Sequence, residues 1–196
     1  SLVSKKKGWL EKALQEKGKK LEWVKSAGSN KANEALRSGN IDVGSTAGSA
    51  ALLARANGSP IKVIDLYSQP EWSALVTTKN SNIHAVSDLK GKSVAVTKGT
   101  DPYFLLLQAL KKEGIAAKEV TIQNLQHADG RTALDNGQVN AWSGLDPIMA
   151  SAEIESHDAL FYRNLDFNTY GFLNATEQFL KDNPDAAQTI VNVYEY

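Results

Sequence analysis

Two short stretches rich in glycine and hydroxyl residues carry the groups best suited to binding a ligand. One runs from Gly44 to Ser49 and the other from Lys98 to Asp101, and each follows an apolar run and precedes a helical pattern. Glycine lets a backbone amide approach a ligand closely, and the first amides of a helix have no partner within that helix. Because the helix dipole also favours negative charge at this end, the two stretches together predict a clamp for an anion.

Contacts to this anion are expected from both stretches. The donors of the first are Ser45, Thr46, Gly48 and Ser49, and the second is lined by Gly99, Thr100, Asp101 and Tyr103. Alone, either stretch is also an ordinary helix start, since Ser, Thr and Asp are the usual N-caps; Asp101, itself negative, either caps its helix or binds an amine. Their pairing favours binding, because both follow strands, and ligands of open α/β sheets lie beyond the carboxyl ends of strands. Neither stretch matches the P-loop or the Rossmann glycine pattern.

Aromatic residues near these stretches in sequence could form the walls of a small-molecule site, because Trp and Tyr combine apolar area with one polar tip. We expect Trp72 and Trp142 to cover an organic stem, with Tyr103 and Tyr170 beside them. For Trp142 and for Phe104, a position in the hydrophobic core is an equally favoured alternative. Asp146, which precedes Pro147, is best interpreted as a helix cap, with a ligand-facing role as the alternative.

Residues for catalysis or metal binding are sparse. His84, His127 and His157 fall in expected loops, without metal-ligand spacing, and are predicted to be ordinary surface residues. Ser45 and Ser49 lack the context of a nucleophile elbow, and the sequence has no cysteine. We therefore predict no catalytic site, no metal site and no cofactor.

Composition narrows the classes of partner. Lys+Arg and Asp+Glu number 22 each, so no basic surplus is available for nucleic acid or an anionic membrane. No apolar run approaches the roughly 20 residues of a membrane span. Residues 1–7 contain no signal-peptide core, so a leader has either been removed or never existed.

The elements that must position these residues alternate between strand and helix. We expect an amphipathic first helix, with Val3, Leu10 and Leu14 on one face, that ends near Gly18. Further helices are predicted at 30–37, 50–54, 101–112, 129–137, from 146 and from 184. Strands are predicted at 21–24, 41–44, 61–66, 73–78, 93–97, 120–125, 139–142 and 170–175. This alternation is typical of parallel βαβ units.

Several segments, in order, resemble a known family. They are Asp42-Val43-Gly44-Ser45-Thr46, Ser59-Pro60-Ile61, the run from Asp88 to Val96 (DLKGKSVAV) with Lys98-Gly99-Thr100, and the run from Gly137 to Trp142 (GQVNAW) followed by Asp146-Pro147. Over nearly the whole chain the sequence resembles periplasmic binding proteins of the nitrate, taurine and alkanesulfonate importers, and within them the aliphatic sulfonate-binding branch.

This resemblance implies a two-lobed α/β fold of the type II periplasmic binding kind, with parallel-rich sheets. The first lobe would comprise residues 1–78 and 171–196, the second residues 79–170, and crossover strands near 74–78 and 170–175 would form a hinge. Because the family usually opens with a strand and ends with further helices, we expect the fold to be incomplete at both ends.

The implied function is capture of an aliphatic sulfonate, or a similar small organic anion, in the cleft between the lobes. The protein would be a periplasmic or lipid-anchored monomer, and it would deliver its ligand to a cognate ABC permease. Nitrate, bicarbonate, taurine or a thiamine precursor are alternative ligands, and an enzyme or the sensory domain of a regulator are alternative classes on the same fold.

Overall fold

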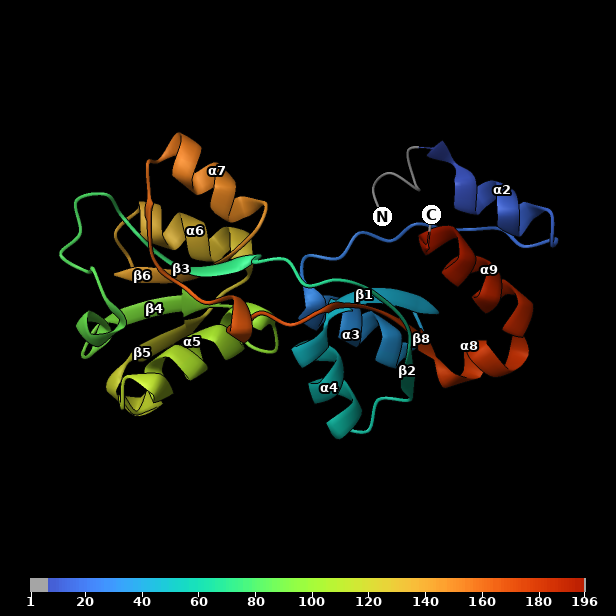
Figure 1. Cartoon of the computed structure of the whole chain (residues 1–196), viewed down its shortest axis with the longest axis horizontal. Coiled ribbons are helices and arrows are strands. Elements are labelled where there is room, and N and C mark those ends of the chain that lie inside the picture. The colour runs from blue at the N-terminus through green and yellow to red at the C-terminus, as the bar shows by residue number, and fades with distance from the viewer. Residues whose placement is uncertain (1–6, 196) are drawn as a thin grey trace. The chain divides into compact units, whose positions relative to one another are not determined.

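The computed structural model describes residues 7–195, which form two compact units (Figure 1). Unit 1 combines the described residues up to Ser68 with those from Tyr170 onward, and unit 2 is the segment Gln69–Thr169. None of the helices described within residues 7–195 has the length and apolar character that crossing a membrane requires.

Unit 1 is a small antiparallel sheet with helices on both faces. Its elements are α2 (Trp9–Gln15), α3 (Ser29–Ser38), β1 (Val43–Ala47), α4 (Gly48–Ala56), β2 (Ile61–Ser68), β8 (Gly171–Thr176), α8 (Glu177–Asp182) and α9 (Pro184–Tyr194). The strand order is β1-β8-β2, so the returning strand β8 lies between the two strands that precede it in the chain. Both pairings are antiparallel, with Ser45 opposite Leu173 and Ala47 opposite Gly171.

The two faces of this sheet have separate cores. On one face Leu173 packs with Leu10 and Leu14 of α2 and with Ala186 and Ile190 of α9. Leu36 of α3, Ala54 of α4 and Ile61 form a second cluster. α2 therefore presents the apolar stripe expected of it, although Val3, which was predicted to belong to that stripe, lies outside the described residues.

Unit 2 has a five-stranded mixed sheet with the order β5-β4-β6-β3-β7. Its elements are β3 (Ser73–Thr77), β4 (Ser93–Val96), α5 (Asp101–Lys112), β5 (Thr121–Asn124), α6 (His127–Asp135), β6 (Ala141–Leu145), α7 (Ile148–Glu155) and β7 (Ala159–Arg163), with short 3-10 helices η1 (Val86–Leu89), η2 (Ala117–Glu119) and η3 (Leu165–Phe167). β4 pairs in parallel with β5 and β6, whereas β3 pairs antiparallel with β6 and β7.

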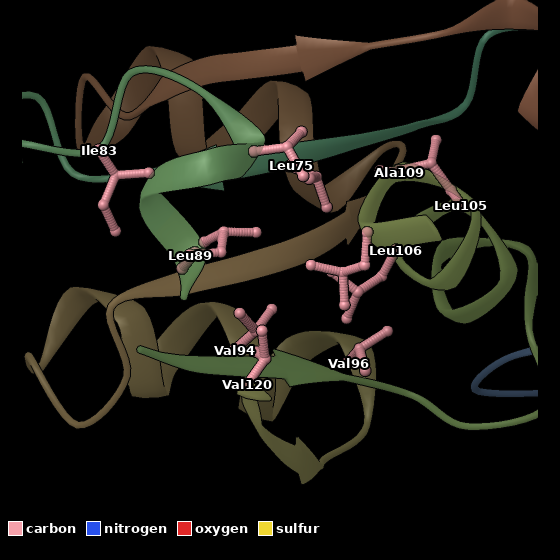
Figure 2. Close-up of a cluster of buried hydrophobic side chains, with 12 residues drawn as sticks. Leu75, Ile83, Leu89, Val94, Val96, Leu105, Leu106, Ala109 and Val120 are labelled. Carbon is pink, nitrogen blue, oxygen red and sulfur yellow. The ribbon is translucent and has the colours of Figure 1, made fainter. Parts of the chain in front are cut away.

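Strand alternation divides the apolar residues of unit 2 between two faces. Leu75, Val94 and Val96 point toward α5, where Leu105, Leu106 and Ala109 complete the cluster drawn in Figure 2. Ala74, Val76, Ala95 and Trp142 point to the other face, toward α6 and α7. Figure 1 shows the same division, with α5 on one side of the sheet and α6 and α7 on the other. The α/β fold class is confirmed, and the sheet of unit 2 is mixed.

Some predicted elements differ from those observed. The strand predicted at 21–24 is wrong: this segment has no strand conformation and pairs with no strand in the described sheets. β7 and α8 were not predicted as elements. The sheets were expected to be rich in parallel pairs. Parallel pairs occur in the described sheet of unit 2, whereas β8 enters the sheet of unit 1 in the antiparallel sense.

The division of the chain into units differs from the expected lobes in the placement of β3. The expected first lobe ended at residue 78, whereas β3 belongs to unit 2. The physical reason is its pairing: every residue of β3 faces a partner in β6, in β7 or in both. The role of these crossover segments as a hinge stays a prediction.

Candidate functional site

The first glycine/hydroxyl stretch forms a direct passage from β1 into α4. Ala47 is the N-cap in an extended conformation, and Gly48 is the first helical residue. The Gly48 amide donates a hydrogen bond of 2.8 Å to the carbonyl of Tyr170. A side chain at Gly48 would approach the Phe172 ring to 3.0 Å, so glycine fits a close contact between α4 and β8. The Gly48 amide, which we predicted to contact the anion, thus binds the chain itself.

The two hydroxyl groups of β1 have different surroundings. Thr46 is buried, and its hydroxyl accepts a hydrogen bond of 2.8 Å from the amide group of Asn174. Ser45 is exposed, and its hydroxyl lies 2.6 Å from the Tyr67 hydroxyl. Ser49 is half-buried in the first turn of α4. Ser45 is therefore the exposed hydroxyl of this stretch.

Tyr67 is a candidate residue that sequence reasoning missed. Its side chain is 41% exposed, and its ring lies against Gly171, the residue that faces the end of β2 in the sheet. Tyr170, which was predicted as part of the site, is exposed next to Gly171. Only the register of β2, β8 and β1 brings Tyr67 to Ser45, so no local sequence signal could have shown it.

The second stretch begins α5 in unit 2. Gly99 has a φ of 77°, a left-handed conformation that glycine adopts without strain, and Thr100 is the N-cap. The Thr100 hydroxyl is buried and donates a 2.6 Å hydrogen bond to the carbonyl of Thr97. This hydroxyl stabilises the turn before α5, which is a structural use of a residue predicted to bind the ligand.

Asp101 is buried and accepts hydrogen bonds from Trp72 and Thr169. Its side chain is 1% exposed. One oxygen, Oδ2, accepts hydrogen bonds of 2.8 Å from Trp72 Nε1 and from the amide of Thr169, and Oδ1 accepts another of 2.8 Å from the Thr169 hydroxyl. The carboxylate therefore joins the start of α5 to residues near both ends of unit 2.

Asp146 belongs to the same neighbourhood. Its amide donates to the carbonyl of Trp72 at 2.9 Å, and its carboxylate accepts from the amide of Ala150 at 3.1 Å. The capping interpretation of Asp146 is confirmed by this bond to the first turn of α7. The bond between Asp146 and Pro147 is cis. Unit 2 thus brings together Trp72, Asp101 and Asp146 from three separate segments.

The remaining predicted aromatic residues of unit 2 serve in packing. Trp142 has no exposed surface and lies against Gly130 of α6, so it occupies the core position that the sequence left as an alternative. Tyr103 and Phe104 are half-buried, with ring centroids 5.8 Å apart at an interplanar angle of 65°. Trp72, also half-buried, is the tryptophan of unit 2 that keeps some exposed surface.

One histidine prediction is wrong. His127 is 2% exposed and begins α6, with Nδ1 3.2 Å from the Thr97 hydroxyl, rather than lying on a surface loop. Its burial lowers the pKa of the imidazole to about 4, because the charged form loses its hydration. His84 and His157 are exposed, as predicted. Within residues 7–195 no group of three or more His, Asp or Glu side chains is placed to hold a metal ion.

Comparison with known proteins shows relatives over 98% of the chain. A curated protein of Escherichia coli (strain K12) named for binding aliphatic sulfonates is 30% identical over 98% of this chain and 60% of its own length. A protein of Bacillus subtilis (strain 168) with the same name is 33% identical over 98% of this chain and 59% of its own length. The chain therefore spans about three fifths of the length of these relatives.

A solved structure is also similar. The alkanesulfonate-binding protein of Xanthomonas axonopodis pv. citri, solved with bound MOPS, matches with a TM-score of 0.90 and 26% identity, covering 98% of this chain and 67% of that protein. The family model described as "NMT1/THI5 like" matches residues 1–196. The chain thus belongs to the NMT1/THI5-like family.

Proposed function

We propose that this protein is the solute-binding component of an ABC importer and that its ligand is an aliphatic sulfonate. The observation that carries the proposal is the TM-score of 0.90, over 98% of the chain, to an alkanesulfonate-binding protein solved with MOPS, whose acidic group is a sulfonate. The same proposal has three further parts. The chain acts as a receptor rather than an enzyme, it lies in the cell envelope, and it delivers its ligand to a membrane permease.

The chemistry of a sulfonate fits the groups that the two units offer. Its three oxygens share one negative charge and only accept hydrogen bonds, so backbone amides and hydroxyls can bind it without a metal or a basic side chain. In unit 1 the first turn of α4 and the exposed hydroxyl of Ser45 are the proposed donors. In unit 2 the proposed donors are the amides of Gly99 and Thr100.

The organic stem of the ligand needs apolar surface. Trp72 in unit 2 and Tyr170 in unit 1 retain exposed ring area and are the proposed contacts. Trp142, which the sequence favoured equally, is buried in the core and is not included.

The environment of Asp101 favours ligands without an amino group. Both of its oxygens already accept hydrogen bonds from Trp72 and Thr169, and the side chain is 1% exposed. An ammonium group on the ligand would have to displace these partners to pair with it. We therefore propose that simple alkanesulfonates bind more tightly than taurine.

Isothermal titration calorimetry with ethanesulfonate, butanesulfonate, taurine, nitrate and glycine tests the proposal. We expect saturable binding at a 1:1 ratio with the alkanesulfonates and weaker binding of taurine. The absence of heat from every sulfonate would refute the proposed ligand. Nitrate binding alone would instead favour an inorganic-anion receptor of the same fold.

Two serine variants of unit 1 test a proposed donor against a matched control. Ser45→Ala removes the exposed hydroxyl of β1, and a charge-assisted hydrogen bond contributes about 1.5–3 kcal/mol, so we expect a loss of affinity of about tenfold or more. Ser38→Ala removes an exposed hydroxyl at the end of α3 in the same unit and should leave the affinity unchanged. Equal affinities of both variants would exclude Ser45 from the site.

A further inference from the structure

A bulge near the end of β2 sets the direction of the Tyr67 side chain. Along this strand Leu66 pairs with Phe172 and Ser68 pairs with Gly171, so Tyr67 is an extra residue between two successive residues of β8. Bulges turn a side chain away from the direction that regular alternation would give it, and they are frequent beside functional sites. The orientation of Tyr67 is therefore built into the backbone of β2.

A glycine in β8 makes room for the Tyr67 ring. Strand β8 lies between β2 and β1, and because neighbouring strands are roughly 4.8 Å apart, about 10 Å separates β2 from β1. The Tyr67 ring crosses this space over Gly171. A Cβ atom at Gly171 would lie 2.3 Å from two carbons of the ring and 2.7 Å from its hydroxyl oxygen. Any larger residue at this position would therefore displace the ring.

The Tyr67 hydroxyl meets Ser45 on the far side of β8. The two hydroxyl oxygens are 2.6 Å apart, and both side chains are exposed, so the pair can be reached from solvent. Each hydroxyl has one proton and can also accept a hydrogen bond. At this distance either oxygen can be the donor. A phenol is the stronger donor of the two because it is more acidic than an aliphatic alcohol, which favours donation from Tyr67 to Ser45.

We propose that Tyr67 is a positioning residue for the ligand: its hydroxyl donates to Ser45 Oγ and so directs the single Ser45 proton toward the sulfonate. This inference rests on the proposed function, in which Ser45 is a ligand donor. A sulfonate oxygen only accepts, so it requires a Ser45 proton that is not already donated to Tyr67. Hydrogen bonds in a chain polarise one another, so the bond from Tyr67 also strengthens the bond from Ser45 to the ligand.

Calorimetry with butanesulfonate on four chains tests the coupling of the two residues. The chains are the parent, Tyr67→Phe, Ser45→Ala and the double variant. Tyr67→Phe keeps the ring over Gly171 and removes only the hydroxyl, so we expect it to weaken binding about threefold to tenfold, the effect of one hydrogen bond. In the Ser45→Ala chain the same substitution should have no effect, because its partner is absent. Equal losses in both backgrounds, or no loss in either, would overturn the proposal.

A tyrosine of unit 2 provides the matched control. Tyr162→Phe removes a hydroxyl that accepts a hydrogen bond of 3.3 Å from the side-chain amide of Asn164. It should leave the affinity for butanesulfonate unchanged. A loss equal to that of Tyr67→Phe would show that the effect is not specific to the pair with Ser45, and would count against the proposal.

A measurement without ligand separates the positioning role from the proposed function. The Hα–Hβ coupling constants of Ser45, measured by NMR, should be those of a single rotamer in the parent chain and averaged over several rotamers in Tyr67→Phe. Averaged couplings already in the parent chain would overturn the positioning role. A parent chain that binds no sulfonate but keeps one Ser45 rotamer would refute the proposed function, while still supporting the positioning of Ser45 by Tyr67.

Discussion

At the scale of single residues, the hydroxyl groups predicted to contact the ligand are of two kinds: some form hydrogen bonds within the chain, and others are exposed. Thr46 and Thr100 are buried and use their hydroxyls within the chain, whereas Ser45 remains exposed. Serine and threonine at a helix start can cap, close a turn or bind a ligand, and the residue type alone does not distinguish these uses. The sequence could therefore locate the two stretches but could not assign each hydroxyl.

The burial of isolated polar residues also could not be predicted from the sequence. His127 was predicted to lie on a surface loop, yet it begins α6 and contacts the end of β4 through Thr97. A histidine between two elements carries no periodic signal, so only the packing of α6 on the sheet shows that its ring is inside. The same holds for Asp101, whose partners Trp72 and Thr169 are distant in sequence.

Asp101→Asn should destabilise unit 2. An asparagine of the same shape would turn an NH2 group toward the Trp72 indole or the Thr169 donors and leave a buried group unpaired. Hydrogen bonds to charged groups contribute about 1.5–3 kcal/mol, so we expect a loss of about 2 kcal/mol or more in the free energy of unfolding. Urea unfolding monitored by tryptophan fluorescence measures it.

The control for this variant is Asp166→Asn, which changes an exposed carboxyl in the same unit and should leave the unfolding midpoint nearly unchanged. A stable Asp101→Asn protein that has specifically lost taurine binding would contradict our account. In that case the carboxylate would face an amine of the ligand rather than anchor α5.

At the scale of elements, prediction succeeded where local signals are strong. The helix predicted at 101–112 has the observed bounds of α5, because Pro102 favours the first turn and Gly114 follows the last. The strand predicted at 21–24 failed because an apolar run becomes a strand only when another strand pairs with it. β7 was missed because its residues do not alternate clearly between buried and exposed positions.

The packing of α6 on the sheet depends on a glycine. A side-chain carbon at Gly130 would lie 2.8 Å from Cδ1 and Nε1 of the Trp142 indole, which is fully buried and cannot move aside. Gly130→Ala should therefore lower stability, because overpacking costs about 1–3 kcal/mol and outweighs the gain in helix propensity of about 1 kcal/mol.

Chemical denaturation of Gly130→Ala, compared with Thr132→Ala two residues further along α6, checks this expectation. Thr132 is exposed, so its replacement should change the free energy of unfolding by less than about 0.5 kcal/mol. A Gly130→Ala protein more stable than the parent chain would show that α6 is less closely packed than the structure indicates.

At the scale of the whole molecule, the α/β class and the order of most elements followed from the alternation of strand and helix patterns. Sheet topology did not follow. The placement of β8 between β1 and β2 depends on contacts between residues far apart in the chain, such as Gly44 and Asn174, which no local pattern encodes. The family resemblance found in the sequence agrees with the relatives and with the family model.

The central proposal is that backbone amides at the starts of α4 and of α5 bind the sulfonate ligand. Titration of the isotopically labelled chain with ethanesulfonate, followed by amide NMR shifts, tests it most directly. The account predicts that amides near Gly48 and near Gly99 shift together, with one common dissociation constant. Shifts confined to one unit, or two different dissociation constants, would contradict it.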